Sequence, residues 1–177
     1  MSRLRPILYH MTMDYPSWYN KVSAPFRGEA AQTAVNALDR ALVYVVAAIY
    51  LIALAWLAMN GDPRFYRAAA VPALVFAAVS IARAIIDAPR PYELFDIDPI
   101  IRKNTKGRSM PSRHVASAFI IACALAWLYV GWGAIAFGAG LVVAFTRIVG
   151  GVHFPRDVIA AIAVSTVCGF VGFALVP

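Results

Sequence analysis

Long apolar stretches alternate with short polar breaks along the chain. A helix needs about 20 residues to cross about 30 Å of hydrocarbon. Three stretches fit one crossing each: Ala41–Met59, Ala68–Ile86 and Val158–Val176. The stretch Val115–Thr146 has no charge, but as one helix it would extend about 48 Å, which is too long for one crossing. We expect the Gly-Trp-Gly sequence at 131–133 to divide it in two, so the pattern predicts five transmembrane helices.

This pattern predicts an all-α fold, a polytopic membrane helical bundle of about five transmembrane helices with an interfacial N-terminal segment. The composition agrees, because 62% of the residues are hydrophobic and 14% are charged, against about 45–50% and about 25% in soluble domains. We assign residues 37–177 to the transmembrane domain and residues 1–36 to the interfacial segment, where Tyr15, Trp18 and Phe26 alternate with charges. A loosely ordered tail explains this segment equally well.

Five crossings place three polar segments on one membrane face: the N-terminus, the loop Asp87–Met110 and the junction Gly150–Asp157. The net charge is +7, and the cations stand between apolar stretches, where they meet lipid headgroups or an anionic substrate rather than nucleic acid. Of the 16 Lys and Arg residues, only Arg64 and Arg67 fall on the opposite face. The positive-inside rule therefore predicts that the polar segments face the cytoplasm.

Six basic side chains gather at the ends of apolar stretches on the face with the polar segments. They are Arg83, Arg90, Arg113, His114, Arg147 and His153. Any one of these arginines is explained equally well by snorkelling to lipid headgroups. Together, however, several guanidiniums can clamp a phosphoryl group with charge-assisted hydrogen bonds. No cluster of His, Cys, Asp and Glu has metal-ligand spacing, so we expect no metal or other cofactor, and the arginines must neutralise the phosphate charge.

The spacing of His153 and Asp157 is typical of a histidine nucleophile. Pro155 lies between them and suits the first position of a helix. Asp157 then falls in the first helical turn, where its carboxylate can accept a hydrogen bond from the imidazole and leave the other ring nitrogen as a nucleophile. His114 follows Ser112, which can cap a helix whose free amides face an anion. His114 is then placed to protonate a leaving oxygen.

These residues belong to three motifs whose order and internal spacing resemble those of a known family. The motifs read Arg83-x6-Arg90-Pro91, Pro111-Ser112-Arg113-His114 and Thr146-Arg147-x5-His153-x3-Asp157. They resemble the three motifs of the type 2 phosphatidic acid phosphatase superfamily. With the flanking helices, the resemblance covers the chain from about Ala68 to the C-terminus.

The resemblance implies a role for each site residue. His153 would be the nucleophile that takes the phosphoryl group, Asp157 would orient it, and His114 would be the general acid for the leaving group. The phosphate oxygens would be held by Arg83, Arg90, Ser112 and Arg147.

Three positions depart from the family pattern. Arg83 replaces the usual lysine and keeps its charge, and Thr146 replaces serine and keeps a hydroxyl. Arg113 replaces a glycine, which would let the backbone amide approach phosphate closely. We expect the Arg113 side chain to bind a second phosphate or an anionic headgroup, which would shift substrate preference.

The function implied is that of an integral membrane lipid phosphatase that hydrolyses a phosphomonoester or diphosphate through a phosphohistidine intermediate. We favour undecaprenyl or another polyprenyl diphosphate over phosphatidylglycerophosphate, phosphatidic acid or phosphorylated lipid A, and a bacterial plasma membrane as the location.

The alternatives are an anion channel or transporter, a vanadium-dependent haloperoxidase, and a non-catalytic lipid-binding protein on the same fold. The family resemblance implies a site that faces away from the cytoplasm, against the positive-inside rule, so sidedness and oligomeric state stay open.

Overall fold

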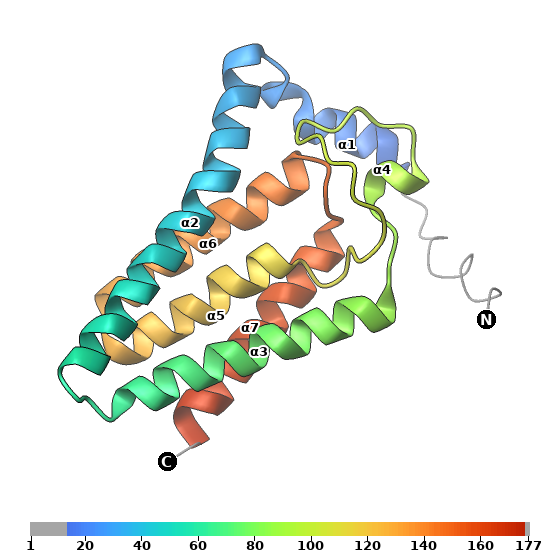
Figure 1. The fold of residues 1–177 in the computed structure, drawn as a ribbon. Coiled ribbons are helices and arrows are strands. Elements are labelled where there is room, and N and C mark those ends of the chain that lie inside the picture. The colour runs from blue at the N-terminus through green and yellow to red at the C-terminus, as the bar shows by residue number, and fades with distance from the viewer. Residues whose placement is uncertain (1–13, 176–177) are drawn as a thin grey trace.

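The computed structural model describes residues 14–175, and these are helical over most of their length. The chain begins with α1 (Tyr15–Ser23) and the short 3-10 helix η2 (Ala24–Phe26), and a further short helix, α4 (Pro91–Leu94), lies between two long ones. The five long helices, shown in Figure 1, are α2 (Glu29–Met59), α3 (Arg64–Ile86), α5 (Arg113–Leu128), α6 (Val130–Val149) and α7 (Pro155–Leu175).

The central helix of the bundle is α5, which contacts α2, α3, α6 and α7. Its side chains Phe119 and Ile120 are buried in the main apolar core with Val79 of α3 and Val143 of α6. Four helices, α2, α3, α6 and α7, are long and apolar enough to cross a membrane, whereas α5 is a shorter apolar helix of 16 residues. The all-α polytopic bundle is therefore confirmed, with four of the five expected crossings at full length.

The break in the long uncharged stretch falls at Tyr129 rather than at the glycines. Tyr129 has an extended backbone, with φ −158° and ψ 115°, and it separates α5 from α6. Gly133 lies in the first turns of α6, where an added Cβ would be 2.2 Å from the Cβ of Ala126. The absent side chain therefore lets α6 approach the end of α5, so this glycine serves helix packing and not the turn.

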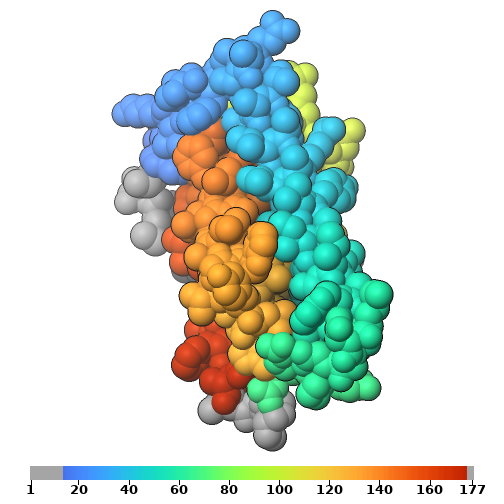
Figure 2. Space-filling view, turned by 90° about the vertical axis from the view of Figure 1, so that its left-hand side faces the viewer, coloured from blue at the N-terminus to red at the C-terminus, as the bar shows by residue number. Residues whose placement is uncertain are grey.

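The first long helix begins earlier than the apolar pattern indicates. It is a continuous helix of 31 residues from Glu29, so residues 29–36 of the expected interfacial segment belong to it. Figure 2 shows α2 running along one face of the molecule beside α6. Its extension places Asp39, which is buried, and Arg40, which is exposed, within a regular helix. The division at residues 36 and 37 stays a prediction, and residues 1–13 of the expected N-terminal segment lie outside the described part of the chain.

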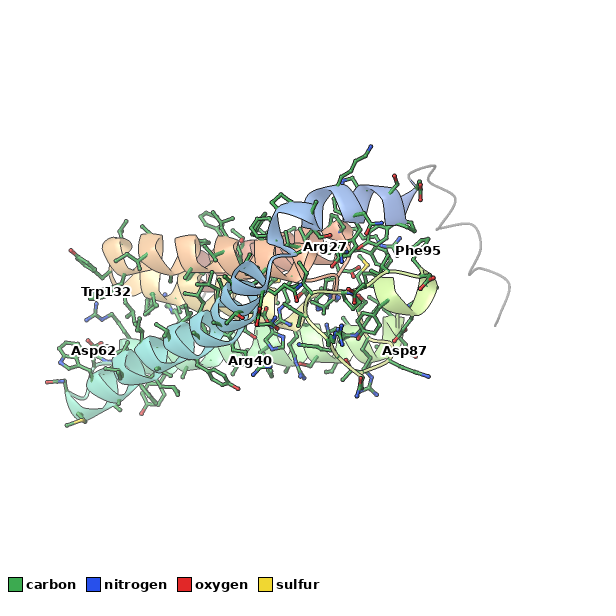
Figure 3. The ribbon with its side chains drawn as sticks, turned by 90° about the horizontal axis from the view of Figure 1, so that it is seen from above. Arg27, Arg40, Asp62, Asp87, Phe95 and Trp132 are labelled. Carbon is green, nitrogen blue, oxygen red and sulfur yellow. The ribbon has the colours of Figure 1, made fainter. Side chains whose placement is uncertain are left out.

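The polar segments gather at one end of the bundle, which we term the polar end. It consists of α1, α4, the loop 95–112 and the α6–α7 junction at 150–154, while the α2–α3 and α5–α6 turns lie at the opposite end (Figure 1). Figure 3 shows the same separation, with Asp87 and Phe95 at the polar end and Asp62 and Trp132 at the other.

The Tyr19 side chain of α1 ties the polar end together. Its hydroxyl donates to the Val149 carbonyl at 3.0 Å and accepts from the Ile100 amide at 3.3 Å. Ile100 and Ile101 are buried against Val149 in a small apolar cluster. The loop 95–112 is therefore fixed to the end of α6 by both hydrogen bonds and apolar contacts.

The close approach of α5 and α6 predicts the effect of Gly133→Ala. The new methyl would overlap Ala126, and the backbone atoms beside it cannot move aside as a flexible side chain could. We expect a loss of about 1–3 kcal/mol in the free energy of unfolding, typical of overpacking, measured by denaturant unfolding in detergent.

Gly138→Ala is the matched control, since a Cβ added at Gly138 would meet no atom within 4 Å. It should be neutral or slightly stabilising because alanine favours helix. Equal stability of the two variants would contradict the packing role of Gly133.

Candidate active site

A buried aspartate in the first turn of α7 lies beside a buried histidine of the α6–α7 junction. The helix begins at Pro155, which confirms the prediction from sequence and places Asp157 in the first turn. One carboxylate oxygen of Asp157, Oδ2, accepts from the Phe154 amide at 3.0 Å and lies 3.7 Å from His153 Nδ1. The exposed fractions are 2% for His153 and 0% for Asp157. The carboxylate therefore faces the ring nitrogen that it was predicted to orient.

Ser109 of the loop 95–112 contacts both His153 and Asp157. Its hydroxyl donates a short hydrogen bond to Asp157 Oδ2 and lies 3.3 Å from His153 Nδ1. The Ser109 side chain thus bridges His153 and Asp157 of the third motif. Ser109 could not be predicted from the sequence, because a serine in a polar loop carries no pattern that distinguishes it from its neighbours.

The environment of His153 favours the neutral imidazole. Burial and the nearby charges of Arg90 and Arg147 lower the pKa of His153 to about 4, although the Asp157 carboxylate opposes the shift. At neutral pH the ring is therefore uncharged, with a lone pair on one nitrogen. A neutral ring is the state that a nucleophile requires.

The two arginines of the first motif connect the loop to the site. Arg83, at the end of α3, donates through Nη1 to the carbonyls of Ser109 and Pro111. Arg90 donates through Nε to the Gly107 carbonyl at 3.1 Å and through Nη1 to the Val152 carbonyl at 3.4 Å. Both guanidiniums are buried. Arg90 thus reaches the residue before His153, and Arg83 reaches the residues before Ser112.

The second motif meets the third through the backbone. The Ser112 amide donates to the Asp157 carbonyl at 3.0 Å. Ser112 takes the N-cap position of α5, but its side chain makes no cap hydrogen bond, so the expected side-chain cap is wrong. Its buried hydroxyl has no hydrogen-bond partner within residues 14–175. Hydrogen bonds therefore bring all three motifs together, and the Ser112 hydroxyl remains available to a ligand.

Arg147 forms a buried ion pair that the motifs did not reveal. Its Nε lies 2.8 Å from Oδ1 of Asp39 on α2, with exposed side-chain fractions of 2% and 5%. The Thr146 hydroxyl lies 3.3 Å from the same oxygen, while Nη1 of Arg147 has no hydrogen-bond partner in the described chain. Asp39 stands beside an apolar helical stretch in the sequence. A carboxylate in such a place needs a partner, because burying a lone charge is costly, and this was the one sign in the sequence of the ion pair.

A cavity of about 430 Å³ opens beside this ion pair. His114, half-buried in the first turn of α5, lines it together with Arg147. The remaining charged side chains of the lining are Asp39, Arg40, Arg102 and Lys103. The cavity therefore joins residues of the second and third motifs to cations of α2 and of the loop.

The structure places Arg113 away from this cavity. Its side chain is exposed, and the guanidinium carbon lies 5.9 Å from the centre of the Phe76 ring on α3. Arg113 is not part of the cavity lining. A role in substrate preference for this residue stays a prediction.

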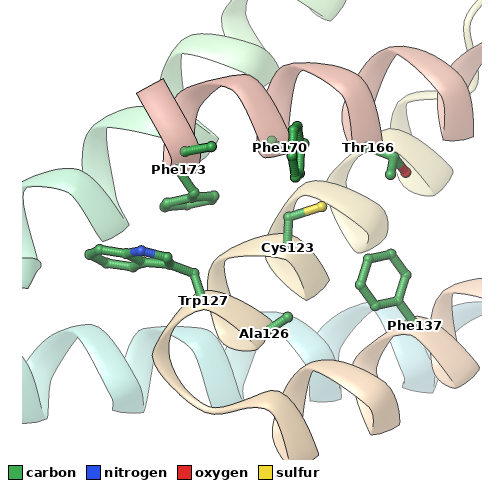
Figure 4. A pocket seen from close by; sticks show the side chains of 9 residues that line it. Cys123, Ala126, Trp127, Phe137, Thr166, Phe170 and Phe173 are labelled. Atoms are coloured by element: carbon green, nitrogen blue, oxygen red, sulfur yellow. The ribbon is translucent and has the colours of Figure 1, made fainter. Parts of the chain in front are cut away.

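A second cavity, of about 370 Å³, is apolar and lies between α5, α6 and α7. Figure 4 shows the side chains around it, among them Cys123, Trp127, Phe137 and Phe173. Its lining contains no charged residue, so it does not suit an anion, whereas the cationic cavity beside Arg147 does. Over residues 14–175, no group of three His, Cys, Asp or Glu side chains is arranged to hold a metal ion.

The fold and the site define a polytopic helical membrane protein that holds a neutral histidine, a buried carboxylate and several arginines at one end of its bundle. The chain belongs to the PAP2 superfamily, whose family model matches residues 64–177, more than half of its length. This confirms the resemblance that the three motifs indicated.

Individual relatives support this assignment to different degrees. Undecaprenyl-diphosphatase BcrC of Bacillus subtilis is 32% identical over 87 residues, which span 48% of this chain and 44% of that protein. The crystal structure of Aquifex aeolicus LpxE has the same fold, with a TM-score of 0.69 and 23% identity over 88% of this chain and 92% of that chain. The PAP2-type phosphatidylglycerolphosphate phosphatase of Bacillus subtilis matches with a TM-score of 0.48 and 20% identity over 88% and 90% of the chains, which adds nothing to the fold assignment.

The buried ion pair predicts a large cost for Asp39→Asn. The amide keeps the shape of the carboxylate but leaves the Arg147 charge buried without a counterion. We expect the free energy of unfolding to fall by about 3–5 kcal/mol, measured by denaturant unfolding in detergent. Asp98→Asn is the control, because Asp98 is exposed and its pairs with Arg27 and Arg102 are worth at most about 1 kcal/mol. A loss no greater than that of the control would contradict the structural role of Asp39.

The position of Arg113 predicts that Arg113→Gly folds and keeps turnover. The residue is exposed, and glycine leaves the backbone amide in place. We expect the ratio of kcat/KM values for different lipid phosphates to change, measured with substrates that differ in headgroup charge. Loss of all turnover in a folded variant would place Arg113 in the core machinery instead.

Proposed function

We propose that the protein is a lipid phosphatase that works without a metal and forms a phosphohistidine on His153. The observation that carries this proposal is the buried contact of His153 with Asp157 and Ser109, joined by hydrogen bonds to the Arg83 and Arg90 motif. Membership of the PAP2 superfamily supports it.

The first step transfers the phosphoryl group to the enzyme. The free nitrogen of His153 attacks phosphorus, and the bond from phosphorus to the leaving oxygen breaks as the nitrogen–phosphorus bond forms. Asp157 holds the proton on Nδ1 and stabilises the positive charge that develops on the ring. His114 gives its proton to the leaving alcohol or phosphate. Guanidiniums and the Ser112 hydroxyl hold the equatorial oxygens, where charge is spread in such a transition state.

The second step releases phosphate. Water attacks the phosphohistidine, and His114, now neutral, accepts the proton of that water. The nitrogen–phosphorus bond breaks, so His153 returns to its neutral state and inorganic phosphate leaves. One histidine thus carries the phosphoryl group, while the other moves the proton in both steps.

We further propose a polyprenyl diphosphate as the substrate and a bacterial plasma membrane as the location. The similarity to a bacterial undecaprenyl-diphosphatase supports both. The basic cavity at the polar end suits a lipid whose phosphate groups lie at the membrane interface. A glycerolipid phosphate, such as phosphatidylglycerophosphate or phosphatidic acid, is the alternative.

The test is phosphate release from a panel of lipid mono- and diphosphates in the presence of EDTA. We expect release by the wild-type protein and background rates for His153→Ala, because the variant has no nucleophile. Radiolabelled phosphate should also be trapped on the wild-type protein and not on the variant. A folded wild-type protein that releases no phosphate from any lipid would contradict the proposal and favour lipid binding or transport.

His114→Ala separates the two histidines. With a lipid substrate its rate should fall by about 100- to 10,000-fold, the usual contribution of a general acid. With p-nitrophenyl phosphate, whose leaving group needs no proton, the formation of phosphohistidine should largely recover in His114→Ala and remain absent in His153→Ala. Recovery in both variants would show that His153 is not the nucleophile.

A further inference from the structure

The loop 95–112 carries one lysine into the cavity beside the Asp39–Arg147 ion pair. Lys103 is half-buried and lines this cavity with Arg147 and His114. Lys106, three residues further on, is exposed and is not part of the lining. Both lysines line a separate cavity beside Tyr92 and Glu93, but only Lys103 also lines the cavity with Arg147 and His114.

Lys103 is held between two anchored residues. On one side, the amide of Ile101, which is buried, donates to the Gly150 carbonyl at 3.1 Å. On the other side, the Tyr92 hydroxyl donates to the Thr105 carbonyl at 2.6 Å. Because Ile101 and Thr105 are both held by hydrogen bonds, the backbone of Lys103 between them is also held in place beside the cavity.

No anion within the described chain neutralises Lys103. The one acidic side chain in the cavity lining, Asp39, is paired with Arg147 and also contacts Thr146. Neither Lys103 nor Arg40, the α2 residue after Asp39 that Figure 3 labels, makes an ion pair or side-chain hydrogen bond with another residue of the range 14–175. A cation that is partly withdrawn from water without a partner is costly, which points to a ligand that supplies the missing charge.

The Lys103 ammonium keeps its proton at neutral pH. Burial and the charge of Arg147 lower its pKa to about 8, while Asp39 opposes the shift. Lysine binds phosphate as a compact point charge, with three donors on a flexible stem. An anion bound beside Lys103 would raise its pKa back towards the usual value for lysine, because a nearby negative charge favours the ammonium.

We propose that Lys103 and Arg40 form a second phosphate subsite, which binds the phosphate of a lipid diphosphate that is not attacked by His153. This inference rests on the proposed function and narrows its substrate class to diphosphates. In the proposed mechanism Arg83, Arg90 and Arg147 hold one phosphoryl group, and a diphosphate ester adds anionic oxygens that need further donors. Arg113 is not part of this subsite, because its guanidinium lies over the Phe76 ring of α3.

The test compares farnesyl diphosphate with farnesyl monophosphate, two substrates with the same tail. In Lys103→Gln we expect the KM for the diphosphate to rise about 10- to 100-fold, the loss typical of a hydrogen bond to a charged group. The kcat/KM for the monophosphate should stay within about twofold. Lys103→Arg should recover most of the diphosphate affinity, because it restores the charge.

Lys106→Gln is the matched control, because it removes the same charge from the same loop outside the cavity. It should leave the ratio of the two substrates unchanged. An equal loss of both substrates in Lys103→Gln, or the same change in both lysine variants, would overturn the second subsite. Melting temperatures of all three variants should match that of the wild-type protein.

A binding measurement separates this inference from the proposed function. Methylenediphosphonate cannot be hydrolysed and should raise the melting temperature of the full-length wild-type protein more than inorganic phosphate does. The difference should vanish in Lys103→Gln and persist in Lys106→Gln. Equal stabilisation by the two anions would overturn the subsite even if the enzyme hydrolyses lipids, whereas a selective effect without turnover would uphold the subsite and contradict only the phosphatase function.

Discussion

The Asp157 carboxylate is buried at the start of α7, and the architecture of the polar end depends on the groups that converge on this residue. Ser109 Oγ, the Phe154 amide and the His153 ring all approach Oδ2, and the Asp157 carbonyl accepts from the Ser112 amide. A buried carboxylate without such partners would be protonated or destabilising. These contacts therefore fix the loop and the first turn of α5 in one arrangement around the histidine.

The buried arginines also need hydrogen-bond or ion-pair partners, and they find two kinds. Arg147 faces a carboxylate on α2, whereas Arg83 and Arg90 donate to backbone carbonyls of the loop and of the α6–α7 junction. Carbonyl acceptors satisfy guanidinium donors without cancelling their charge, so the region stays strongly cationic. Because the side chains that hold the loop are also the proposed phosphate ligands, folding of the polar end and assembly of the site are one process.

Some of the site could be predicted from the sequence, and the reason lies in local spacing. His153 and Asp157 lie on either side of Pro155, which indicates the start of a helix. In the structure α7 begins at this proline, and the two side chains lie next to each other. The partners that come from distant segments could not be predicted in this way. Ser109 and Asp39 lie 48 and 107 residues from the groups that they contact. No periodicity or motif links such pairs, because only the packing of α2, α5, α6 and α7 brings them within reach.

The sequence by itself determined that this protein is a helical membrane bundle with most of its basic groups at one end, because hydrophobic length and charge are properties of single segments. Through three motifs it also indicated membership of the PAP2 superfamily, and the family match confirms this membership. The tertiary structure alone decided that the chain breaks at Tyr129 instead of at the glycines, since helix packing requires Gly133 elsewhere. It likewise decided that Lys103 rather than Arg113 faces the cavity, because the direction of a side chain depends on the elements that surround it.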